Sequence, residues 1–307
     1  MSNIFFNIIG LLTNPSYRFE KLRMTSKYRS LPDRVYLEKA YKAYFHKKLD
    51  LNQPKTFNEK LQWLKLYDRR PEYTIMADKY LVRKYIAKTI GEEYLIPLLG
   101  VWDTPEQIDF NVLPDQFVLK CNHNSGKGMC ICRSKNSLDF EEVKMRLRKG
   151  LKQEYYSEGR EWPYRNIPRK IICERYLQDD ELKDLPDYKV HNFNGIPRVI
   201  LVCKNRFNNG GLTENFYTPD WKLLPVQRPC HPNAVTDIPE PSQLQEILRL
   251  SKILSKDIPF VRTDFYVVNQ HVYFGEITFY PGSGFLPFEP EKWDRFWGDW
   301  ITLPENN

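Results

Sequence analysis

The sequence lacks a Cys-x-x-Cys pair, and its five histidines have no metal-ligand spacing. These absences disfavour a zinc site and a redox motif. Six cysteines are present, most of them inside apolar runs such as "MCIC" at 129–132. We expect reduced thiols of the core rather than disulfides. No Ser-His-Asp or Cys-His arrangement is recognisable, so the sequence offers no candidate for a protein nucleophile.

Long apolar runs are also missing. The first residues, "MSNIFFNIIGLL", are apolar over only about nine positions, too few to span a bilayer. They contain neither a basic segment nor a small-residue cleavage site. We expect a helix packed on the core of a cytoplasmic protein. Peripheral contact with the inner face of the membrane is the alternative.

A strong charge bias is absent as well. The formal net charge is +7, from 46 basic and 39 acidic residues spread through the chain. This suits a nucleotide, an acidic polymer or an anionic membrane surface, but it is not the concentrated basic stripe of a nucleic-acid binder. With 307 residues and 41% hydrophobic content, the chain can form one large domain or two lobes.

The pattern of apolar residues changes along the chain. Residues 1–95 are predicted to be helical, and "TFNEKLQWLKLYDR" has apolar or aromatic residues at 57, 61, 64 and 67 behind a Thr56–Glu59 capping box. Later runs of Val, Ile and aromatic residues predict strands, with helices only around 140–155 and 241–256. The expected strands are 116–122, 128–134, 169–177, 187–195, 197–206, 260–269 and 271–279. We therefore predict an α+β fold with antiparallel sheets.

A glycine-containing segment joins two of the expected strands. In "FVLKCNHNSGKGMCIC", Lys120 ends one strand and residues 124–128 form the connection. Glycines allow close backbone approach to a phosphate chain, and successive N–H groups bind anions. An ordinary hairpin turn is the alternative. Asn122 and His123, which flank the loop, are candidate substrate contacts.

Two carboxylates frame the next connection. "IICERYLQDDELKDLPDYKV" places Glu174 near the end of an apolar strand and Asp187 at the start of the next. The backbone after such a strand can hydrogen-bond an adenine edge, and a later carboxylate can bind ribose hydroxyls. The alternative for each residue is an ordinary surface salt bridge.

Charged residues converge in "FVRTDFYVVNQHVYFGEITFYPGSGF", residues 260–285. Arg262 and Asp264 are two apart on one strand and share a face, as do Glu276 and Thr278 on the next. A short turn at 269–271 would pair the two strands. Two carboxylates on one face repel unless a cation lies between them, and magnesium favours a few carboxylates plus phosphate oxygens. An Arg-Asp-Glu salt-bridge cluster is the alternative.

Aromatic residues near basic ones are candidates for binding a sugar polymer, because aromatic faces pack on sugar rings. The candidates are Arg206, Tyr217 and Trp221. The tryptophans of "EKWDRFWGDW", at 293, 297 and 300, have the helical spacing that is more typical of core packing.

Over residues 20–305 the sequence resembles the TupA-like family of the ATP-grasp superfamily. The segments that carry the resemblance are "TFNEKLQWLKLYDR" at 56–69, "ADKYLVRKYI" at 77–86, "FVLKCNHNSGKG" at 117–128, "FNGIPRVI" at 193–200 and "FGEITFYPGSGF" at 274–285. That family is found with bacterial polysaccharide biosynthesis. The resemblance implies two α+β lobes that sandwich ATP. It implies a helical region at 1–75, a linker helix and small lobe at 76–175, and a large lobe with the metal-binding hairpin at 176–307.

The resemblance also implies roles for single residues. Lys79, with Lys84 as a less favoured substitute, would reach the ATP phosphates. Lys120 would contact ATP from the strand before the glycine loop. The mobile lid would be formed by Asn124, Ser125, Gly126, Lys127 and Gly128. The adenine hinge would be formed by Glu174, Arg175, Tyr176 and Leu177, with Asp187 at the ribose.

On the hairpin, Asp264 and Glu276 would bind magnesium and Arg262 would stabilise the transferring phosphate. Thr278 stands where the wider superfamily has an asparagine, so it is a weaker ligand for a second metal ion. The predicted substrate contacts are Asn122, His123, Arg206, Gly282, Ser283 and Gly284.

The implied activity is an ADP-forming carboxylate–amine ligase that works through an acylphosphate. It would attach an amino acid or amine to a carboxylated sugar of a capsular or surface polysaccharide, in contact with the membrane or with polysaccharide-assembly proteins. A glycosyltransferase is one alternative, disfavoured because no Asp-x-Asp is present. A nucleotide- or glycan-binding scaffold is another, disfavoured because Lys120, Arg262, Asp264 and Glu276 are all present.

Overall fold

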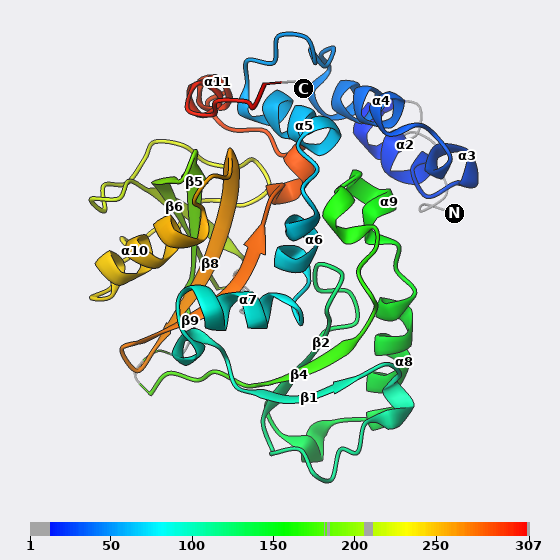
Figure 1. Cartoon of the computed structure of the whole chain (residues 1–307), viewed down its shortest axis with the longest axis vertical. Helices are drawn as coiled ribbons and strands as arrows, with labels where there is room; N and C mark the ends of the chain where they lie inside the picture. The colour runs from blue at the N-terminus through cyan, green and yellow to red at the C-terminus, as the bar shows by residue number, and fades with distance from the viewer. Residues whose placement is uncertain (1–12, 181, 183–184, 206–210, 306–307) are drawn as a thin grey trace.

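The computed structural model of the chain describes residues 13–180, 182, 185–205 and 211–305 (Figure 1). The apolar N-terminal segment, which we expected to form a helix on the core, falls at 1–12 and lies outside the described residues. Within the described ranges, no helix is both long enough and apolar enough to cross a membrane.

Helices form the first part of the described chain, as the apolar pattern predicts. They are α2 (Pro15–Leu22), α3 (Ser26–Arg29), α4 (Asp33–Phe45), α5 (Phe57–Tyr67), α6 (Pro71–Ala77) and α7 (Val82–Thr89). The predicted capping box is confirmed, because the Thr56 hydroxyl accepts from the Glu59 amide and the Glu59 carboxylate accepts from the Thr56 amide. The predicted apolar face of α5 is buried except for Tyr67 at its end.

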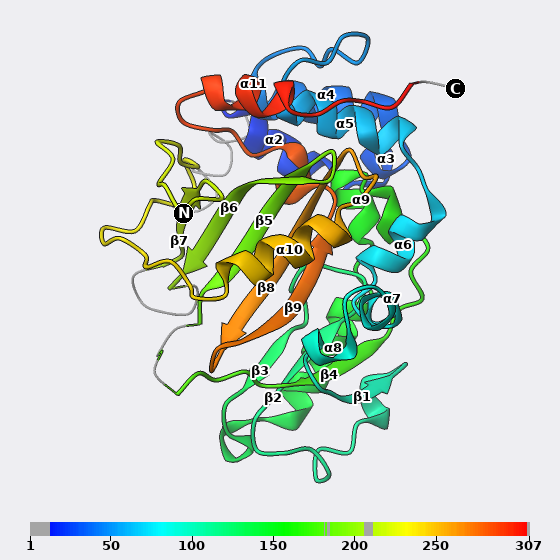
Figure 2. The ribbon, with the colours of Figure 1, turned by 60° about the vertical axis from the view of Figure 1, so that its left-hand side comes forward.

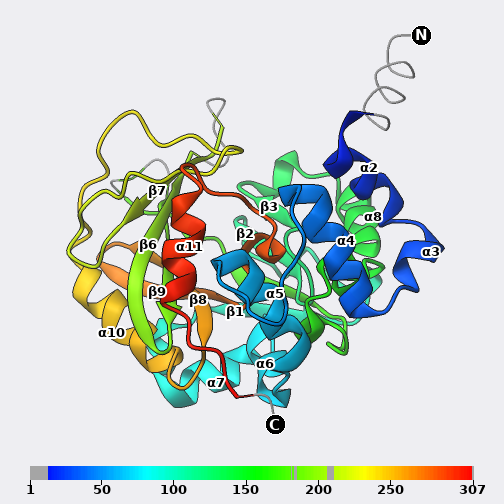
Figure 3. The same ribbon diagram turned by 90° about the horizontal axis from the view of Figure 1, so that it is seen from above.

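The last helix packs on this helical region. Helix α11 (Lys292–Asp299) lies against α5 (Figure 3). Its Trp293 and Trp297 are buried, as their spacing predicts. The Asp294 carboxylate accepts hydrogen bonds of 2.9 Å from both the backbone and the side-chain amide of Asn58. Segments from opposite ends of the chain therefore form one helical layer.

The first sheet has four antiparallel strands in the order β1-β4-β2-β3. They are β1 (Leu98–Trp102), β2 (Phe117–Cys121), β3 (Cys130–Cys132) and β4 (Ile171–Arg175), and α8 (Phe140–Leu151) packs against β2. This sheet and α8 have a hydrophobic core of their own. The structure describes all six cysteines as thiols; five are buried as expected, whereas Cys230 is exposed.

The second sheet has five antiparallel strands in the order β7-β6-β5-β8-β9. They are β5 (Asp187–Phe193), β6 (Ile196–Lys204), β7 (Thr213–Tyr217), β8 (Phe260–Val268) and β9 (His271–Thr278). Helix α10 (Leu244–Leu254) lies across one face (Figure 2), where the Ser251 hydroxyl bonds Asn192 and Thr263. Because side chains alternate along a strand, the neighbours of Thr263 point to the opposite face.

The predicted α+β fold is confirmed, and each predicted strand segment contains a strand. Strands β1 and β7 were not predicted. In β1 the register shifts between Leu98 and Gly100, so the apolar alternation is lost. In β7, "TENFY", the polar Glu214 and Asn215 are both buried, which hides the alternation. Residues 176–186 connect the two sheets, and the expected division of the chain near residue 175 stays a prediction.

Candidate functional site

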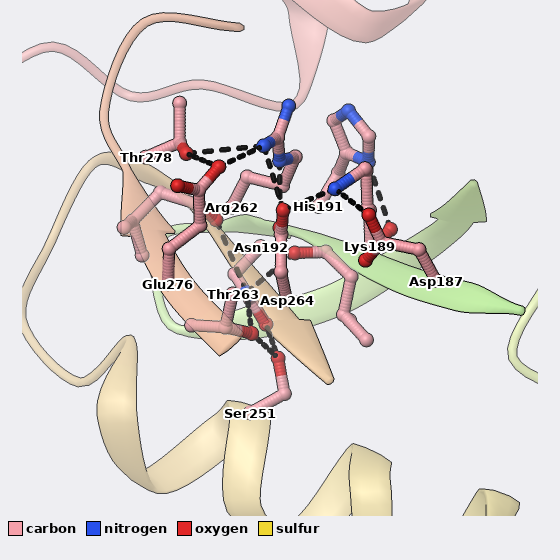
Figure 4. Close-up of polar contacts among 12 residues, drawn as sticks. Asp187, Lys189, His191, Asn192, Ser251, Arg262, Thr263, Asp264, Glu276 and Thr278 are labelled. Atoms are coloured by element: carbon pink, nitrogen blue, oxygen red, sulfur yellow. Dashed lines mark hydrogen bonds and ion pairs between the residues drawn. The ribbon is translucent and has the colours of Figure 1, made fainter. Parts of the chain in front are cut away.

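The predicted hairpin forms, and its charged residues meet on the face of the large sheet opposite α10 (Figure 4). Arg262 pairs with Thr278 and Asp264 pairs with Glu276 across β8 and β9. Arg262 donates two hydrogen bonds of 2.7 Å to Asp264, one of 3.0 Å to Glu276 and one of 3.1 Å to the Thr278 hydroxyl. One guanidinium therefore contacts all three predicted metal ligands.

A buried lysine that the sequence analysis missed belongs to the same cluster. Lys189 on β5 is paired with Asp264 of β8, and its ammonium contacts Asp264 and, at 2.6 Å, Asp187 (Figure 4). Burial alone would lower the pKa of Lys189, but the two carboxylates outweigh burial and raise it. Lys189 therefore carries a positive charge into the sheet face. Its only signal in the sequence is its two-residue spacing from Asp187.

Lys79 connects the hairpin to the glycine-containing loop. Its Nζ donates a hydrogen bond of 2.8 Å to the carbonyl of Asn124 and lies 3.5 Å from the Glu276 carboxylate. Burial by itself would raise the pKa of Glu276, but Lys79, Arg262 and other lysines hold it well below its usual range. The Glu276 side chain is 35% exposed, against 2% for Asp264. The hairpin thus presents one ionised, accessible carboxylate.

A cleft lies beside this cluster and is lined by both sheets. Its apolar and aromatic lining includes Val118 and Ile131 from the small sheet and Tyr266 from the large sheet. Of the predicted nucleotide contacts, the cleft brings together Lys120, Glu174, Arg175, Tyr176, Leu177 and Asp187. Apolar walls with a few charged groups are typical of sites for small molecules that combine a planar ring with charge.

Lys120 and Glu174 pair on neighbouring strands of the small sheet. The Lys120 ammonium lies 2.6 Å from the Glu174 carboxylate. Arg83 of α7 lies 3.3 Å from the same carboxylate and donates a hydrogen bond of 2.8 Å to the carbonyl of Ile96. Glu174 therefore orients two cations at the cleft. Lys84, the substitute considered for Lys79, is exposed on α7.

The predicted lid connects β2 and β3 as a hairpin with a fixed base. The Asn124 side-chain amide donates to the carbonyl of Lys127 at 3.1 Å and to a carbonyl of α8 at 3.2 Å. Gly126 and Gly128 have φ values of 79° and 84°, which favour glycine. A Cβ atom at Gly128 would lie 2.9 Å from a carbonyl oxygen of α8, whereas one at Gly126 would meet nothing within 4 Å. Ser125, Gly126 and Lys127 are exposed, so the tip projects from a packed base.

Two predicted substrate contacts, Asn122 and His123, are buried at the end of β2. The Asn122 amide donates hydrogen bonds of 2.9 Å to the Asp78 carboxylate and to the carbonyl of Pro168. The ring Nε2 of His123 lies 3.2 Å from the carbonyl of Gln153. Asn122 therefore holds neighbouring segments together, and its contact with a substrate stays a prediction, as does that of His123.

Protein stability is expected to fall below pH 6.5 because of His123. Burial is the main cause that lowers its pKa from 6.5 to about 4, and the charges of Arg169 and Lys79 add to it against the contact with Gln153. Below pH 6.5 the unfolded chain binds a proton that the folded chain refuses, so stability is lost as the pH falls toward 4.

This loss is measurable by urea unfolding at pH 7 and pH 5. The His123 contribution at pH 5 is about 2 kcal/mol. A His123→Gln variant has no imidazole to titrate and should lose correspondingly less stability over this interval. Equal losses in the two proteins would contradict the expectation.

The predicted substrate turn follows directly on β9. Its residues with left-handed backbone are Gly282, Ser283 and Gly284, with φ values of 55°, 54° and 62°. The buried Lys65 of α5 donates a hydrogen bond of 2.7 Å to the carbonyl of Ser283, and Gln62 donates one of 2.8 Å to that of Gly284. The Ser283 hydroxyl donates to Glu161 at 2.5 Å. The turn is therefore held from α5, through residues that the sequence analysis did not single out.

The aromatic residues considered for sugar binding pack against each other. The rings of Tyr217 and Trp221 stack with centroids 4.5 Å apart and an interplanar angle of 9°. The Trp221 indole also donates a hydrogen bond of 3.0 Å to the carbonyl of Ile238. These rings are therefore engaged in the fold. Arg206, the remaining predicted substrate contact, lies outside the described residues.

A sequence profile described as TupA-like ATPgrasp matches residues 59–302. The chain belongs to the TupA-like ATP-grasp family. Among solved structures, it is similar to D-alanine–D-alanine ligases from Bacillus anthracis, complexed with ATP, and from Helicobacter pylori, each 17% identical with a TM-score of 0.38. It is also similar to N5-carboxyaminoimidazole ribonucleotide synthetase from Thermus thermophilus, which is 13% identical with a TM-score of 0.38.

These similarities cover 66%, 75% and 72% of this ATP-grasp chain and 55%, 64% and 51% of the three solved chains, in that order. The chain therefore spans between half and two thirds of the length of those proteins. Among curated proteins, none matches the sequence.

In this ATP-grasp protein, the hairpin supplies the oxygen donors expected for magnesium. Asp264 and Glu276 offer carboxylates and Thr278 offers a hydroxyl, which are the hard ligands that magnesium prefers. Within the residues that the structure describes, no group of three or more His, Cys, Asp or Glu could hold a metal by itself. The donor set fits an ion that completes its shell with phosphate oxygens and water.

Proposed function

We propose that this TupA-like ATP-grasp protein is an ADP-forming carboxylate–amine ligase. Its substrates would be an amino acid or another amine and a carboxylated sugar of a bacterial surface polysaccharide or its precursor. The observation that supports the reaction class is the cleft with apolar walls beside a cluster of cations. These cations are Lys79, Lys120, Lys189 and Arg262. The sugar acceptor rests on the resemblance to a family found with polysaccharide biosynthesis.

The cleft suggests how ATP would lie. The base would insert between the apolar walls, within reach of the backbone at 174–177, and Asp187 would accept hydrogen bonds from the ribose. The triphosphate would extend toward Lys120, Lys79 and the hairpin. Cations fixed in advance by carboxylates are suited to charge that develops during phosphoryl transfer, because little reorganisation is needed.

The chemistry then proceeds in two displacements. A carboxylate oxygen of the sugar attacks the γ-phosphorus, the bond to the β,γ-bridging oxygen breaks, and ADP leaves. The amine attacks the resulting acylphosphate, the carbon–oxygen bond to phosphate breaks, and the amine loses a proton. Arg262 is positioned to stabilise the transferring phosphoryl group, since it is already oriented by Asp264. Bound magnesium would neutralise phosphate charge beside Asp264, Glu276 and Thr278.

Product analysis tests the reaction class. ATP, magnesium, a uronic acid and a panel of amino acids should yield ADP and phosphate only when both acceptor and amine are present. Release of AMP would contradict the acylphosphate route. Binding of a nucleotide sugar without binding of ATP would favour a glycosyltransferase. Magnesium-dependent ATP binding with no phosphate release under any mixture would favour a scaffold.

A Glu276→Gln variant is expected to bind ATP about tenfold or more weakly in the presence of magnesium, because one charged donor is lost. Its affinity without magnesium should change much less. Calorimetric titration of ATP with and without magnesium measures both. Glu291→Gln, which alters a carboxylate that is 77% exposed, is the matched control. If magnesium strengthened ATP binding equally in wild type and in Glu276→Gln, the metal site would not lie on the hairpin.

A further inference from the structure

A second hollow is lined by residues of and around α9 (Tyr155–Gly159). Figure 1 shows α9 between the N-terminal helices and the small sheet. This hollow is lined by the end of α3, by residues of the segment 153–169 and by His123. The nucleotide cleft shares none of these residues. The lining of the second hollow includes four arginines and a single acidic residue, Glu154. The hollow is therefore strongly positive.

Two of these arginines are engaged by the protein itself. Arg160 is buried, lies 3.6 Å from Asp33 and donates to backbone carbonyls around α3. Arg169 donates to the carbonyl of Leu151 at 2.9 Å and lies 3.9 Å from Glu154. These two arginines shape the hollow, and Asp33 and Glu154 partly balance their charges.

The other two arginines are available to a ligand. Within the described ranges, neither Arg29 nor Arg165 has a hydrogen-bond or ion-pair partner for its guanidinium, and both are exposed. The Arg165 guanidinium is placed 5.2 Å from the centre of the Tyr156 ring, which orients it. A planar guanidinium with open donors is suited to bidentate contact with a carboxylate or phosphate.

Buried polar atoms in the same wall also lack partners. His123 is only 2% exposed, and its Nδ1 atom has no hydrogen bond to any part of the chain that the structure describes. The same holds for Oε1 of Gln153, whose amide is used by Glu158. Buried polar atoms are normally paired, so a polar ligand or an ordered water that reached these two atoms would supply the partner that each lacks.

Two tyrosines form part of the wall of this hollow, and the segment that carries them reaches the turn after β9. Tyr155 and Tyr164 line the hollow and pack edge to face, with ring centroids 4.8 Å apart. Gly159 at the end of α9 lies directly against Ser283 of the turn after β9, because a Cβ atom at Gly159 would lie 2.3 Å from the Ser283 hydroxyl oxygen. That hydroxyl donates a hydrogen bond of 2.5 Å to Glu161. The segment that lines the hollow therefore also contacts the predicted substrate turn.

We propose that this hollow binds the acceptor of the ligase through a second anionic group, next to the sugar whose carboxylate reacts. This inference rests on the proposed function and adds to it that the acceptor is at least dianionic. Arg29 and Arg165 would hold the second group, and the tyrosine faces would pack on the sugar ring. The second group is either a neighbouring uronic acid or the phosphate of a sugar nucleotide.

Calorimetry without ATP tests this proposal. Trigalacturonate and UDP-glucuronic acid are titrated in turn into wild type, into Arg29→Gln/Arg165→Gln and into the control Arg295→Gln. Arg295 is exposed on α11, where it pairs with Asp299. One of the two ligands should bind to wild type and to the control, and about tenfold more weakly to the double variant. Glucuronic acid and maltotriose, which lack the second charge, should bind weakly to all three proteins.

The pattern of binding identifies the source of the second charge. Preference for trigalacturonate assigns it to an acidic polymer, and preference for UDP-glucuronic acid assigns it to a sugar nucleotide. Equal affinity of the double variant and wild type for both ligands, or no binding of either, overturns the proposal. Magnesium-dependent ATP binding is measured on the same samples. If ATP binds while the acidic ligands do not, only this inference fails; if the acidic ligands bind and ATP does not, the ligase assignment fails.

Discussion

An Arg262→Met variant is expected to lose about 3–5 kcal/mol of unfolding free energy and about two to three orders of magnitude in kcat. The side chain is 12% exposed and makes four hydrogen bonds, to Asp264, Glu276 and Thr278. Methionine fills similar space but leaves the buried Asp264 carboxylate with Lys189 as its remaining ionic partner. A buried carboxylate that loses its main partner is costly because its charge is no longer compensated.

Urea unfolding and steady-state ATP turnover measure the two effects separately. Arg262→Lys keeps the charge but loses the two-pronged contact, so it should fall between wild type and Arg262→Met in both measurements. Arg295→Met removes an exposed pair and should change stability by less than about 1 kcal/mol. An Arg262→Met protein with wild-type stability would mean that the cluster is not ionised as its geometry indicates. Wild-type ATP turnover in this variant would show that Arg262 takes no part in the reaction.

A Lys65→Met variant is expected to lose a similar amount of stability, about 3–5 kcal/mol. Lys65 is fully buried, and its ammonium donates hydrogen bonds of 2.7 Å to the carbonyls of Gly159 and Ser283 and one of 2.9 Å to Gln62. Removing it takes one donor from each of three acceptors and leaves the buried Glu161 without its main positive neighbour. The turn after β9 also loses one of its anchors on α5, and Gln62 remains as the other.

Lys60→Met provides a matched control on the same helix. The Lys60 ammonium also donates to two backbone carbonyls, of Gly298 and Ile301, but its removal leaves no buried carboxylate behind. Its expected cost is about 1–2 kcal/mol. Adding Glu161→Gln to Lys65→Met should restore part of the lost stability, and a urea double-mutant cycle measures that coupling. A Lys65→Met cost no larger than that of Lys60→Met would show that Glu161 does not depend on Lys65.

The parts of the site that depend on local spacing were predictable. Arg262 and Asp264 share a face because strand side chains alternate, and the short turn at 269–271 places Glu276 and Thr278 opposite them. The capping box of α5 and the glycine loop are likewise encoded within a few neighbouring residues. The family resemblance, which the profile match over 59–302 confirms, added the expected order of the lobes, and that order stays a prediction.

The parts that depend on distant pairing were not predictable from the sequence alone. Lys189 reaches Asp264 only because β5 lies between β6 and β8 in the large sheet. The contact between Lys65 and Ser283 joins residues 218 positions apart. Neither lysine stands in a recognisable motif, and a lysine in an apolar run is usually interpreted as an exposed position. Lys65 and Lys189 are buried because the fold brings distant partners close to them.

The Lys79 side chain contacts both the glycine loop and the hairpin. One ammonium holds the carbonyl of Asn124 at the base of the loop and also faces the Glu276 carboxylate. A ligand that draws Lys79 toward its own negative charge would therefore loosen the loop as it binds. By thermodynamic linkage, the factor by which the bound ligand shifts the loop toward its loosened state equals the factor by which the ligand binds that state more tightly than the held state. The position of the loop therefore depends on whether a ligand is bound at the hairpin.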